Sequence, residues 1–324
     1  MRKIGVLTSG GDSPGMNAAI RSVVRTCAYH NVGCVGIYRG YDGLIEGNLV
    51  ELGPRSVSNL INKGGTMLQS ARSMRFKTPE GRKIAYDNLV KNEIDGLVII
   101  GGDGSFTGGL VFNSEHNFPV IGIPGTIDND IYGTSHTLGY DTALNTVIEA
   151  IDKIRDTASS HNRLFFVEVM GRDAGHIALN AGIGSGAEEI LIPEEDLGLD
   201  RLMESLQKSN AAGKTSSIVV IAEGDKIGKN IFELRDYVKG MLPEYDIRVS
   251  VLGHMQRGGS PTCFDRVLAS RMGVKAVESL LEGKSNYMVG LVNNKMELTP
   301  LSKAIKEHSE IDTELLRVSD IMST

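Results

Sequence analysis

The strongest constraint on this chain is an alternation between short apolar runs that end in glycine and longer segments with helical spacing. Runs of a few consecutive apolar residues are typical of parallel strands that are buried on both faces. Helical patterns between such runs indicate crossover connections. The alternation therefore predicts an α/β fold with mostly parallel sheets, and 324 residues are enough for two such domains.

The pattern places the individual elements. Ser13 and Pro14 supply a cap and a first turn for the first helix. We expect strands at residues 4–8, 34–38, 96–100, 120–123, 164–169, 190–192, 217–222 and 247–252. We expect helices at residues 16–29, 57–62, 79–91, 141–157 and 266–281, and a further helix that opens at the GGDGS segment.

Composition and charge exclude several classes of protein. The net charge of −6 argues against a general nucleic-acid binder. Three cysteines without metal-type spacing, Cys27, Cys34 and Cys263, fit a reducing cytosol. No signal peptide is visible, and no apolar run approaches the roughly 20 residues of a membrane span. We expect a cytoplasmic protein that binds neither nucleic acid nor membrane.

Two glycine-rich loops each follow a predicted strand and open a predicted helix. Residues 8–15 read TSGGDSPG and residues 101–105 read GGDGS. Backbone amides of paired glycines can approach an anion, and a helix N-terminus favours negative charge. A tight turn explains residues 8–15 equally well. Asp103 could cap its helix or hold magnesium, and the glycine density around it favours the ligand site.

A third loop, residues 124–130, reads PGTIDND. Asp128 and Asp130 are carboxylates two residues apart at a strand end, which suits a general base, although a solvated turn would have the same composition. A set of basic residues lies near other element ends, where guanidinium forks suit phosphate: Arg163, Arg172, Arg248, His254 and Arg257.

These motifs together resemble the bacterial ATP-dependent 6-phosphofructokinase family. The matching segments are LTSGGDSPGMNAAIR, GGDGS, PGTIDND, DKIRDTASSH, VEVMGRDAGH and VLGHMQRGGSPTCFDRVLASR, and they span nearly the whole chain in order. The resemblance implies two Rossmann-like α/β domains facing a central cleft. It places ATP binding on residues 1–139 plus 255–305, and sugar-phosphate binding on residues 140–254 plus 306–324.

The resemblance also implies roles in the transfer of the ATP γ-phosphoryl group to the 1-hydroxyl of fructose 6-phosphate in glycolysis. Asp128 is expected to be the general base, Thr126 and Asp130 to position the reacting groups, and Arg72 and Arg172 to stabilise the transferring phosphoryl group. Asp103 is expected to hold Mg²⁺. The ATP site is expected to comprise Gly11, Arg72, Gly102, Asp103, Gly104 and Ser105.

For fructose 6-phosphate, the resemblance implies contacts from both sides of the reacting centre. The expected contacts within one subunit are Thr126, Ile127, Asp128, Met170, Gly171, Arg172, Glu223, His254 and Arg257. Arg163 and Arg248 are expected to reach in from a neighbouring subunit, which implies an active site shared within a homotetramer.

Other interpretations remain open. Pyrophosphate-dependent relatives typically carry aspartate and lysine where this chain has Gly104 and Gly125, so glycine at both positions favours ATP. Kinases of NAD or of diacylglycerol lipids share a GGDG-type loop, but they leave PGTIDND unexplained. A catalytically inactive nucleotide sensor is the alternative outside the enzymes.

The sequence departs from the family pattern in two places. The residues expected at an effector site for ADP or phosphoenolpyruvate are Arg21, Arg25, Arg155, Glu188 and Lys214, whereas Pro54, Asn59, Thr215 and Ser216 differ from frequent family residues. We therefore expect weak or altered allostery. The segment Ser73-Met74-Arg75-Phe76 replaces a more usual Cys-Pro-Glu-Phe. Arg72 is kept, so we expect catalysis to survive.

Overall fold

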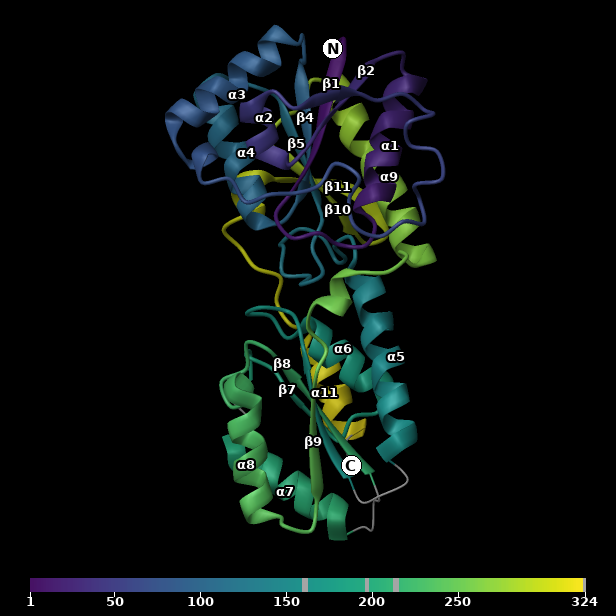
Figure 1. Ribbon diagram of the computed structural model, residues 1–324, viewed down its shortest axis with the longest axis vertical. Coiled ribbons are helices and arrows are strands. Elements are labelled where there is room, and N and C mark those ends of the chain that lie inside the picture. The colour runs from purple at the N-terminus through teal and green to yellow at the C-terminus, as the bar shows by residue number, and fades with distance from the viewer. Residues whose placement is uncertain (159–162, 196–197, 212–215, 323–324) are drawn as a thin grey trace. The chain divides into compact units, whose positions relative to one another are not determined.

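The computed structural model describes residues 1–158, 163–195, 198–211 and 216–322. The chain forms two compact units (Figure 1). Unit 1 comprises residues 1–127, 131–142 and 257–309, and unit 2 comprises residues 128–130, 143–256 and 310–324. The boundaries expected from the sequence lie within a few residues of these, except that the structure groups residues 128–130 with unit 2.

Unit 1 is built on a seven-stranded sheet in the order β11-β10-β5-β4-β1-β2-β3. The five inner strands run parallel, and β3 and β11 pair antiparallel at the two edges. The strands are β1 (Lys3–Ser9), β2 (Gly33–Ile37), β3 (Leu49–Glu51), β4 (Gly96–Gly101), β5 (Val120–Pro124), β10 (Tyr287–Val292) and β11 (Lys295–Pro300). The crossover order places the carboxyl ends of β1, β4 and β5 side by side.

Helices cover both faces of this sheet (Figure 1). One core lies under α1 (Met16–Tyr29) and α9 (Cys263–Leu281). The other lies under α2 (Gly40–Glu46), α3 (Pro79–Lys91) and α4 (Asp103–His116). The short helix α10 (Leu301–Ala304) follows β11. Two buried clusters on opposite faces are what a doubly wound sheet requires.

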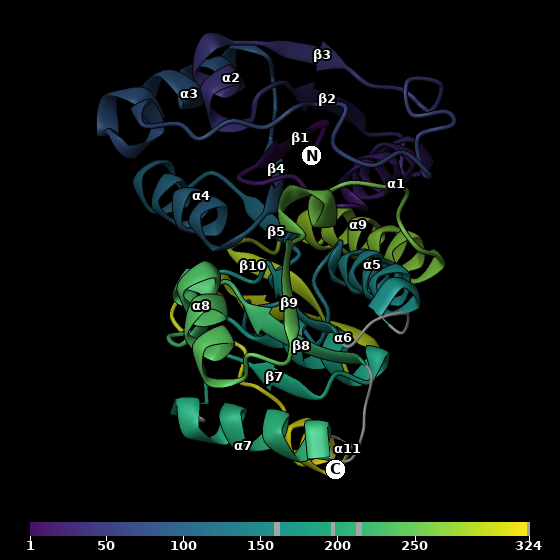
Figure 2. The ribbon, with the colours of Figure 1, turned by 60° about the horizontal axis from the view of Figure 1, so that its bottom comes forward.

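Unit 2 has a four-stranded parallel sheet in the order β7-β8-β6-β9. The strands are β6 (Arg163–Val169), β7 (Glu189–Leu191), β8 (Ser216–Ala222) and β9 (Asp246–Val251). A core of side chains from β6 and β8 packs under α7 (Gly198–Ala211) and α8 (Ile231–Met241). The remaining helices are α5 (Tyr140–Ala158), α6 (His176–Ser185) and α11 (Thr313–Met322) (Figure 2).

The structure confirms the α/β class and most predicted elements, and corrects two predictions. The residue that precedes α1 as its cap is Gly15 rather than Ser13, and no side chain makes a capping hydrogen bond there. Residues 57–62 form turns rather than the expected helix, although Val57 and Leu60 are buried. Their apolar spacing reflects a loop that packs on the core of unit 1. The predicted ranges do not include α2, β3, α6, α7, α8, β10, β11, α10 or α11.

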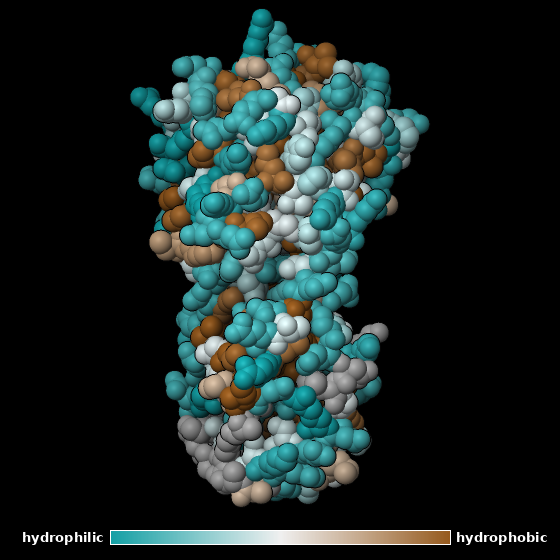
Figure 3. Space-filling model, turned by 180° about the vertical axis from the view of Figure 1, so that it is seen from behind, coloured by the Kyte–Doolittle hydropathy of each residue, from teal (hydrophilic) through white to brown (hydrophobic). Residues whose placement is uncertain are grey.

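The exposed surface is mixed in polarity, with hydrophobic residues scattered between hydrophilic ones (Figure 3). The largest exposed apolar side chains include Tyr29, Met74, Phe232 and Met241. Among the helices that the structure describes, none is both long and apolar enough to cross a membrane.

A buried carboxylate joins the amino ends of α5 and α9 in unit 1. Asp265 is fully buried and accepts hydrogen bonds from the Gly139 N–H at 3.0 Å and the Thr142 N–H at 2.9 Å. The hydroxyl of Thr142 also donates to Asp265, at 2.5 Å. Thr262 caps α9 by accepting from the Asp265 N–H at 3.2 Å. Burial raises the pKa of Asp265 to about 6, although the hydrogen bonds from Thr142 and Gly139 act to lower it.

This pKa shift predicts a pH-dependent contribution to stability. The folded state binds a proton more tightly than the unfolded state, so stability from Asp265 is full below pH 4 and is lost as the pH rises through 6. Relative to Asp265→Asn, the wild-type free energy of unfolding should fall between pH 4 and 6.5 by on the order of 2–3 kcal/mol. Urea unfolding of both proteins measures this difference. Parallel stability curves for the two proteins would contradict the prediction.

Candidate functional site

In unit 1, three predicted loops follow strands that are neighbours in the sheet. The loops after β1, β4 and β5 hold residues 10–15, 102–105 and 125–127. The Gly125 N–H donates to the Gly101 carbonyl at 3.0 Å. A Cβ on Gly102 would lie 4.0 Å from the Cβ of Thr126. The structure therefore brings the GGDGS and PGT segments together at one edge of this sheet.

The first turn of α4 presents Asp103 and Gly104 to solvent, whereas Ser105 is buried. The cap residue of α4 is Gly102, and no side chain makes a capping hydrogen bond. The alternative role of Asp103 as the helix cap is therefore wrong. An exposed carboxylate in the first turn remains available to a ligand.

The carboxylate of Asp103 suits magnesium as a single protein ligand. Over the ranges that the structure describes, no group of three or more His, Cys, Asp or Glu side chains could hold a metal ion. Mg²⁺ usually takes one or two protein carboxylates and completes its shell with water and substrate phosphates. One carboxylate beside a glycine-rich helix start fits that mode of binding.

Side chains that the sequence analysis did not identify hold the Arg72 segment in place. The hydroxyl of Thr8 donates to the Gln69 carbonyl at 2.7 Å. Ser73 donates to Asp42 of α2 and accepts from the Phe76 N–H at 3.1 Å. These contacts fix the loop on both sides of Arg72, whose side chain is exposed.

An aromatic pair links this segment to the start of α4. The ring of Tyr41 stacks on Phe76, with centroids 3.9 Å apart, and its hydroxyl donates to the Ser105 carbonyl at 2.5 Å. Burial raises the pKa of Tyr41 well above its usual range, so this hydroxyl keeps its proton. No local sequence pattern signals these contacts, because α2 supplies Tyr41 from a distant part of the chain.

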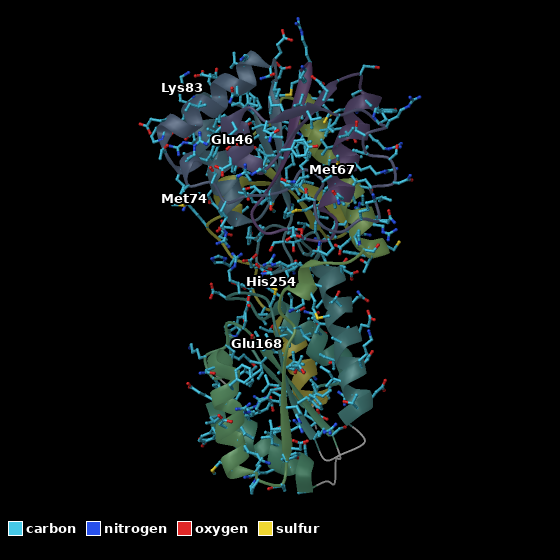
Figure 4. All side chains as sticks on the ribbon, in the orientation of Figure 1. Glu46, Met67, Met74, Lys83, Glu168 and His254 are labelled. Atoms are coloured by element: carbon cyan, nitrogen blue, oxygen red, sulfur yellow. The ribbon has the colours of Figure 1, made fainter. Side chains whose placement is uncertain are left out.

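Arg75, the additional cation in this segment, pairs with an acidic residue of the protein. Its Nη1 lies 3.7 Å from Glu46, which also pairs with Arg39 at 3.5 Å. Figure 4 shows Glu46 and Met74 on the α2–α4 side of unit 1. Arg75 and Arg39 therefore share one carboxylate, which offsets part of their combined charge.

Arg257 lies against the loop that follows β1. Its Nη1 donates to the Asp12 carbonyl at 3.4 Å, and a Cβ on Gly11 would lie only 2.8 Å from that nitrogen. The structure thus brings together Arg257, expected at the sugar phosphate, and Gly11, expected at ATP. The side chain at position 11 must be absent for the guanidinium to occupy this place.

We predict that Gly11→Ala displaces Arg257 without unfolding the protein, because the clash is with the end of a flexible side chain. Gly11→Ala and Arg257→Ala should each lower kcat/KM for fructose 6-phosphate by about tenfold, a loss of roughly 1.4 kcal/mol of transition-state stabilisation. Their effects should not add in the double variant, because both remove the same contact. Steady-state kinetics of the three variants measures this, and fully additive losses would contradict it.

In unit 2, Asp128 and Arg172 form an ion pair. The Asp128 carboxylate is 1% exposed, and one of its oxygens lies 3.5 Å from Nη2 of Arg172, whose side chain is 61% exposed. The Arg172 N–H donates to Glu223 at 2.8 Å. The structure therefore brings two other predicted site residues, Asp128 and Glu223, into contact with Arg172.

The backbone of residues 170–174 explains why glycine precedes Arg172. Gly171 has φ 144° and Arg172 has φ 57°, both in the left-handed region. A Cβ on Gly171 would lie 2.3 Å from the Ala174 carbonyl. The Met170 N–H donates to Gln256 at 3.2 Å, and Gln256 is fully buried. Gln256 is thus a supporting residue that the sequence analysis did not single out.

Two further groups flank this turn. Glu168 lies one residue before the end of β6, and burial together with the nearby charge of Glu223 raises its pKa. His254 is exposed in the short 3-10 helix Gly253–Arg257 that follows β9. Figure 4 shows both side chains in unit 2. Asp130 is partly buried, and Thr126 and Ile127, at the end of unit 1, are buried.

Arg163 and Arg248 lie away from the other predicted contacts of unit 2. Arg163 is the first residue of β6, and Arg248 lies on the adjacent β9, opposite Phe165. Met170 and Arg172 follow the other end of β6. At about 3.3 Å per residue, the seven residues of β6 separate the two groups by about 20 Å. One chain therefore does not bring the two groups together.

The expected effector residues are divided between the two units. Arg21 and Arg25 line a cavity of about 390 Å³ between α1 and α9 in unit 1. In unit 2, Arg155 donates to the carbonyls of Ser185 and Gly186, each at 2.8 Å. Glu188 is buried and accepts from the Ile218 N–H at 2.5 Å. Lys214 and Thr215 lie outside the described residues, as does the SSH end of the DKIRDTASSH segment.

Comparison with known proteins gives consistent matches. Residues 3–280 match the family model described as phosphofructokinase. The chain is 53% identical to ATP-dependent 6-phosphofructokinase 2 of Bacteroides thetaiotaomicron over 97% of this chain and 96% of that protein. It is also 53% identical to ATP-dependent 6-phosphofructokinase 1 of Thermus thermophilus, over the full length of both.

Solved structures show the same architecture. Phosphofructokinase of Saccharomyces cerevisiae matches with a TM-score of 0.88 and 38% identity over 94% of this chain. The chain spans only 45% of that longer yeast chain. Pyrophosphate-dependent phosphofructokinase of Marinobacter aquaeolei matches with a TM-score of 0.84 over 97% of this chain and 86% of its own. At 22% identity, this second likeness shows the fold alone.

Proposed function

The chain belongs to the phosphofructokinase family, and from this premise we propose that it is an ATP-dependent 6-phosphofructokinase. The enzyme transfers the γ-phosphoryl group of ATP to the 1-hydroxyl of fructose 6-phosphate and releases fructose 1,6-bisphosphate and ADP. The observation that carries the proposal is the buried Asp128 carboxylate paired with Arg172. It supplies a proton acceptor beside a cation that suits phosphate.

Asp128 is proposed to accept the proton of the 1-hydroxyl, and the resulting oxygen attacks the phosphoryl group in line. Phosphoryl transfer needs little covalent help from the protein, so positioning and charge stabilisation dominate catalysis. Arg172 and Arg72 stabilise charge on the transferring group. Thr126 and Asp130 position the reacting groups, with Thr126 fixed by the Thr137 hydroxyl on its carbonyl at 2.7 Å.

The nucleotide is proposed to bind at the carboxyl edge of the unit 1 sheet, on Gly11, Arg72 and residues 102–105. Asp103 would hold Mg²⁺, which neutralises charge on the phosphate oxygens when it is bound. The pairing of Arg75 with Glu46 and the fixed position of the Arg72 loop support an intact nucleotide site despite the unusual segment.

Fructose 6-phosphate is proposed to bind through Met170, Gly171, Arg172, Glu223, His254 and Arg257, with Ile127 beside Asp128. Arg163 and Arg248 are proposed to hold the 6-phosphate of a substrate bound at a neighbouring subunit. The separation of about 20 Å along β6 supports this assignment. It requires an oligomer, for which we propose a homotetramer in the cytoplasm.

Regulation by ADP and phosphoenolpyruvate is proposed to be weak or altered. Arg155 and Glu188 already make hydrogen bonds within the chain. Breaking such bonds would offset part of what an effector gains. Pro54 and Asn59 lack the charges that frequent family residues would supply at those positions.

A donor comparison tests the proposed function. Purified protein is assayed with fructose 6-phosphate, Mg²⁺ and either ATP or pyrophosphate. Formation of fructose 1,6-bisphosphate is followed through aldolase and coupling enzymes that oxidise NADH. Turnover with ATP and at least tenfold less with pyrophosphate is expected. Equal or greater turnover with pyrophosphate would contradict the choice of donor. ATP binding without turnover would identify a nucleotide sensor instead.

A further inference from the structure

Asp246, at the start of β9, binds both of the arginines that lie at the amino ends of the unit 2 strands. Its Oδ2 accepts from Nε of Arg163 at 3.2 Å and from Nε and Nη2 of Arg248 at 3.2 and 2.9 Å. The Asp246 side chain is 45% exposed. Neither the motifs nor the family resemblance assigned this residue a role.

The sheet register fixes this arrangement. Asp246 lies directly opposite Arg163 across the β6–β9 pair, and Arg248 follows two residues later on β9. Residues at i and i+2 of a strand share a face, so both guanidinium groups reach the same carboxylate oxygen. In these three bonds Arg163 uses only Nε and Arg248 leaves Nη1, so several N–H donors remain for another anion.

The chemistry of Asp246 makes it a permanent anion at neutral pH. The hydrogen bond from Arg248 is the main cause that lowers its pKa, and Arg163 acts in the same direction. A carboxylate bound to two arginines resembles, in charge and hydrogen bonding, one edge of a phosphomonoester. Asp246 thus holds the two arginines together.

We propose that Asp246 is an affinity-setting residue that competes with the phosphate group of the substrate for Arg163 and Arg248. The inference rests on the proposed binding of the 6-phosphate by these two arginines. A phosphomonoester that approaches the pair meets a nearby negative charge and must replace bonds that the carboxylate already makes. Asp246 therefore orders the two cations and weakens phosphate binding at the same time.

The test is Asp246→Asn, which keeps an oxygen acceptor of the same shape and removes the charge. KM for fructose 6-phosphate should fall, because the competing charge is removed. The fall should be only about three- to tenfold, because exposed ion pairs are individually weak. Turnover and KM for ATP should not change. Since the site becomes more positive, KM for fructose 6-phosphate should also rise more steeply with added salt than in the wild type.

Asp236→Asn is the matched control. Asp236 pairs with Arg235 at 2.7 Å on α8 and is exposed, so the same change of charge is made in the same unit at a carboxylate that pairs with a different arginine. Its kinetics should equal those of the wild type. Asp246→Thr, a second neutral variant whose side chain suits an edge strand, should also lower KM for fructose 6-phosphate.

The outcomes separate this inference from the function on which it rests. An active Asp246→Asn protein whose KM for fructose 6-phosphate is unchanged or raised would contradict the competition and leave the kinase assignment intact. Wild-type protein without turnover on fructose 6-phosphate would instead contradict the proposed function. Unchanged KM in Arg163→Ala and Arg248→Ala would contradict the assignment of the phosphate to these arginines.

Discussion

Asp128→Ser lowers turnover by a factor of about 10²–10⁴, the usual effect of losing a general acid or base. The loss arises because serine cannot accept the proton of the 1-hydroxyl as the new bond to phosphorus forms. Binding of ATP should change little, because the proposed nucleotide contacts come from other loops. Steady-state turnover and equilibrium ATP binding on the same preparation measure both quantities.

Asp128→Asn separates the loss of the base from a change in folding. Asparagine has nearly the shape of aspartate, so the environment around Arg172 changes less than with serine, yet it cannot act as the base. Both variants should be similarly inactive, with thermal unfolding close to that of the wild type. Asp152→Asn, on the exposed side of α5, is the control for a lost negative charge and should remain fully active. An Asp128→Ser protein that keeps more than a tenth of wild-type turnover would contradict the role of Asp128 as the general base.

Gly104→Asp should reduce kcat/KM for ATP by roughly 10²-fold. The new carboxylate would lie next to Asp103, where the phosphates of the nucleotide are proposed to bind. Like charges a few ångströms apart at a protein surface cost about 1–4 kcal/mol, which corresponds to a factor of about 5–10³ in rate. Initial rates over a range of ATP concentrations give this loss directly.

The structure makes this substitution a clean test of ligand binding. A Cβ on Gly104 meets no atom within 4 Å, so the fold should tolerate the change. Gly125 does not offer an equivalent test, because a Cβ there would lie 3.1 Å from side-chain atoms of both Ile100 and Met16. Gly104→Ala is the control and should bind ATP nearly as the wild type does. Undiminished use of ATP by folded Gly104→Asp would contradict the nucleotide site.

The α/β class, most of the strands and the ligand loops could be predicted from the sequence. Alternating apolar runs and helical patterns predict parallel strands with crossover helices, since these periodicities are local properties of the chain. Glycines and carboxylates directly after strands mark the loops at residues 10–15, 102–105 and 125–130 for the same reason. This pattern favours Asp103 as a ligand, whereas Asp128 could be chosen as the base only through the family resemblance.

Residues 57–62 show where local periodicity misleads. Their apolar spacing comes from a loop that buries Val57 and Leu60 on the unit 1 core rather than from a helix. Among the elements that were not placed, α2 and β10 are short. By contrast, α7 and α8 are longer amphipathic helices whose period is present in the sequence. Burial in the tertiary structure explains the loop at residues 57–62.

The sequence by itself determined which chemical groups this protein carries and at which strand ends they stand, because strand ends and glycine turns are local features. Only the tertiary structure decided their partners: Arg172 with Asp128, Arg257 with Gly11, and Asp246 with two arginines. Apart from Asp246 and Arg248, which are two residues apart on β9, each of these contacts joins segments that are far apart in the chain or on different strands. Sheet order and register set such contacts, and no single segment encodes them.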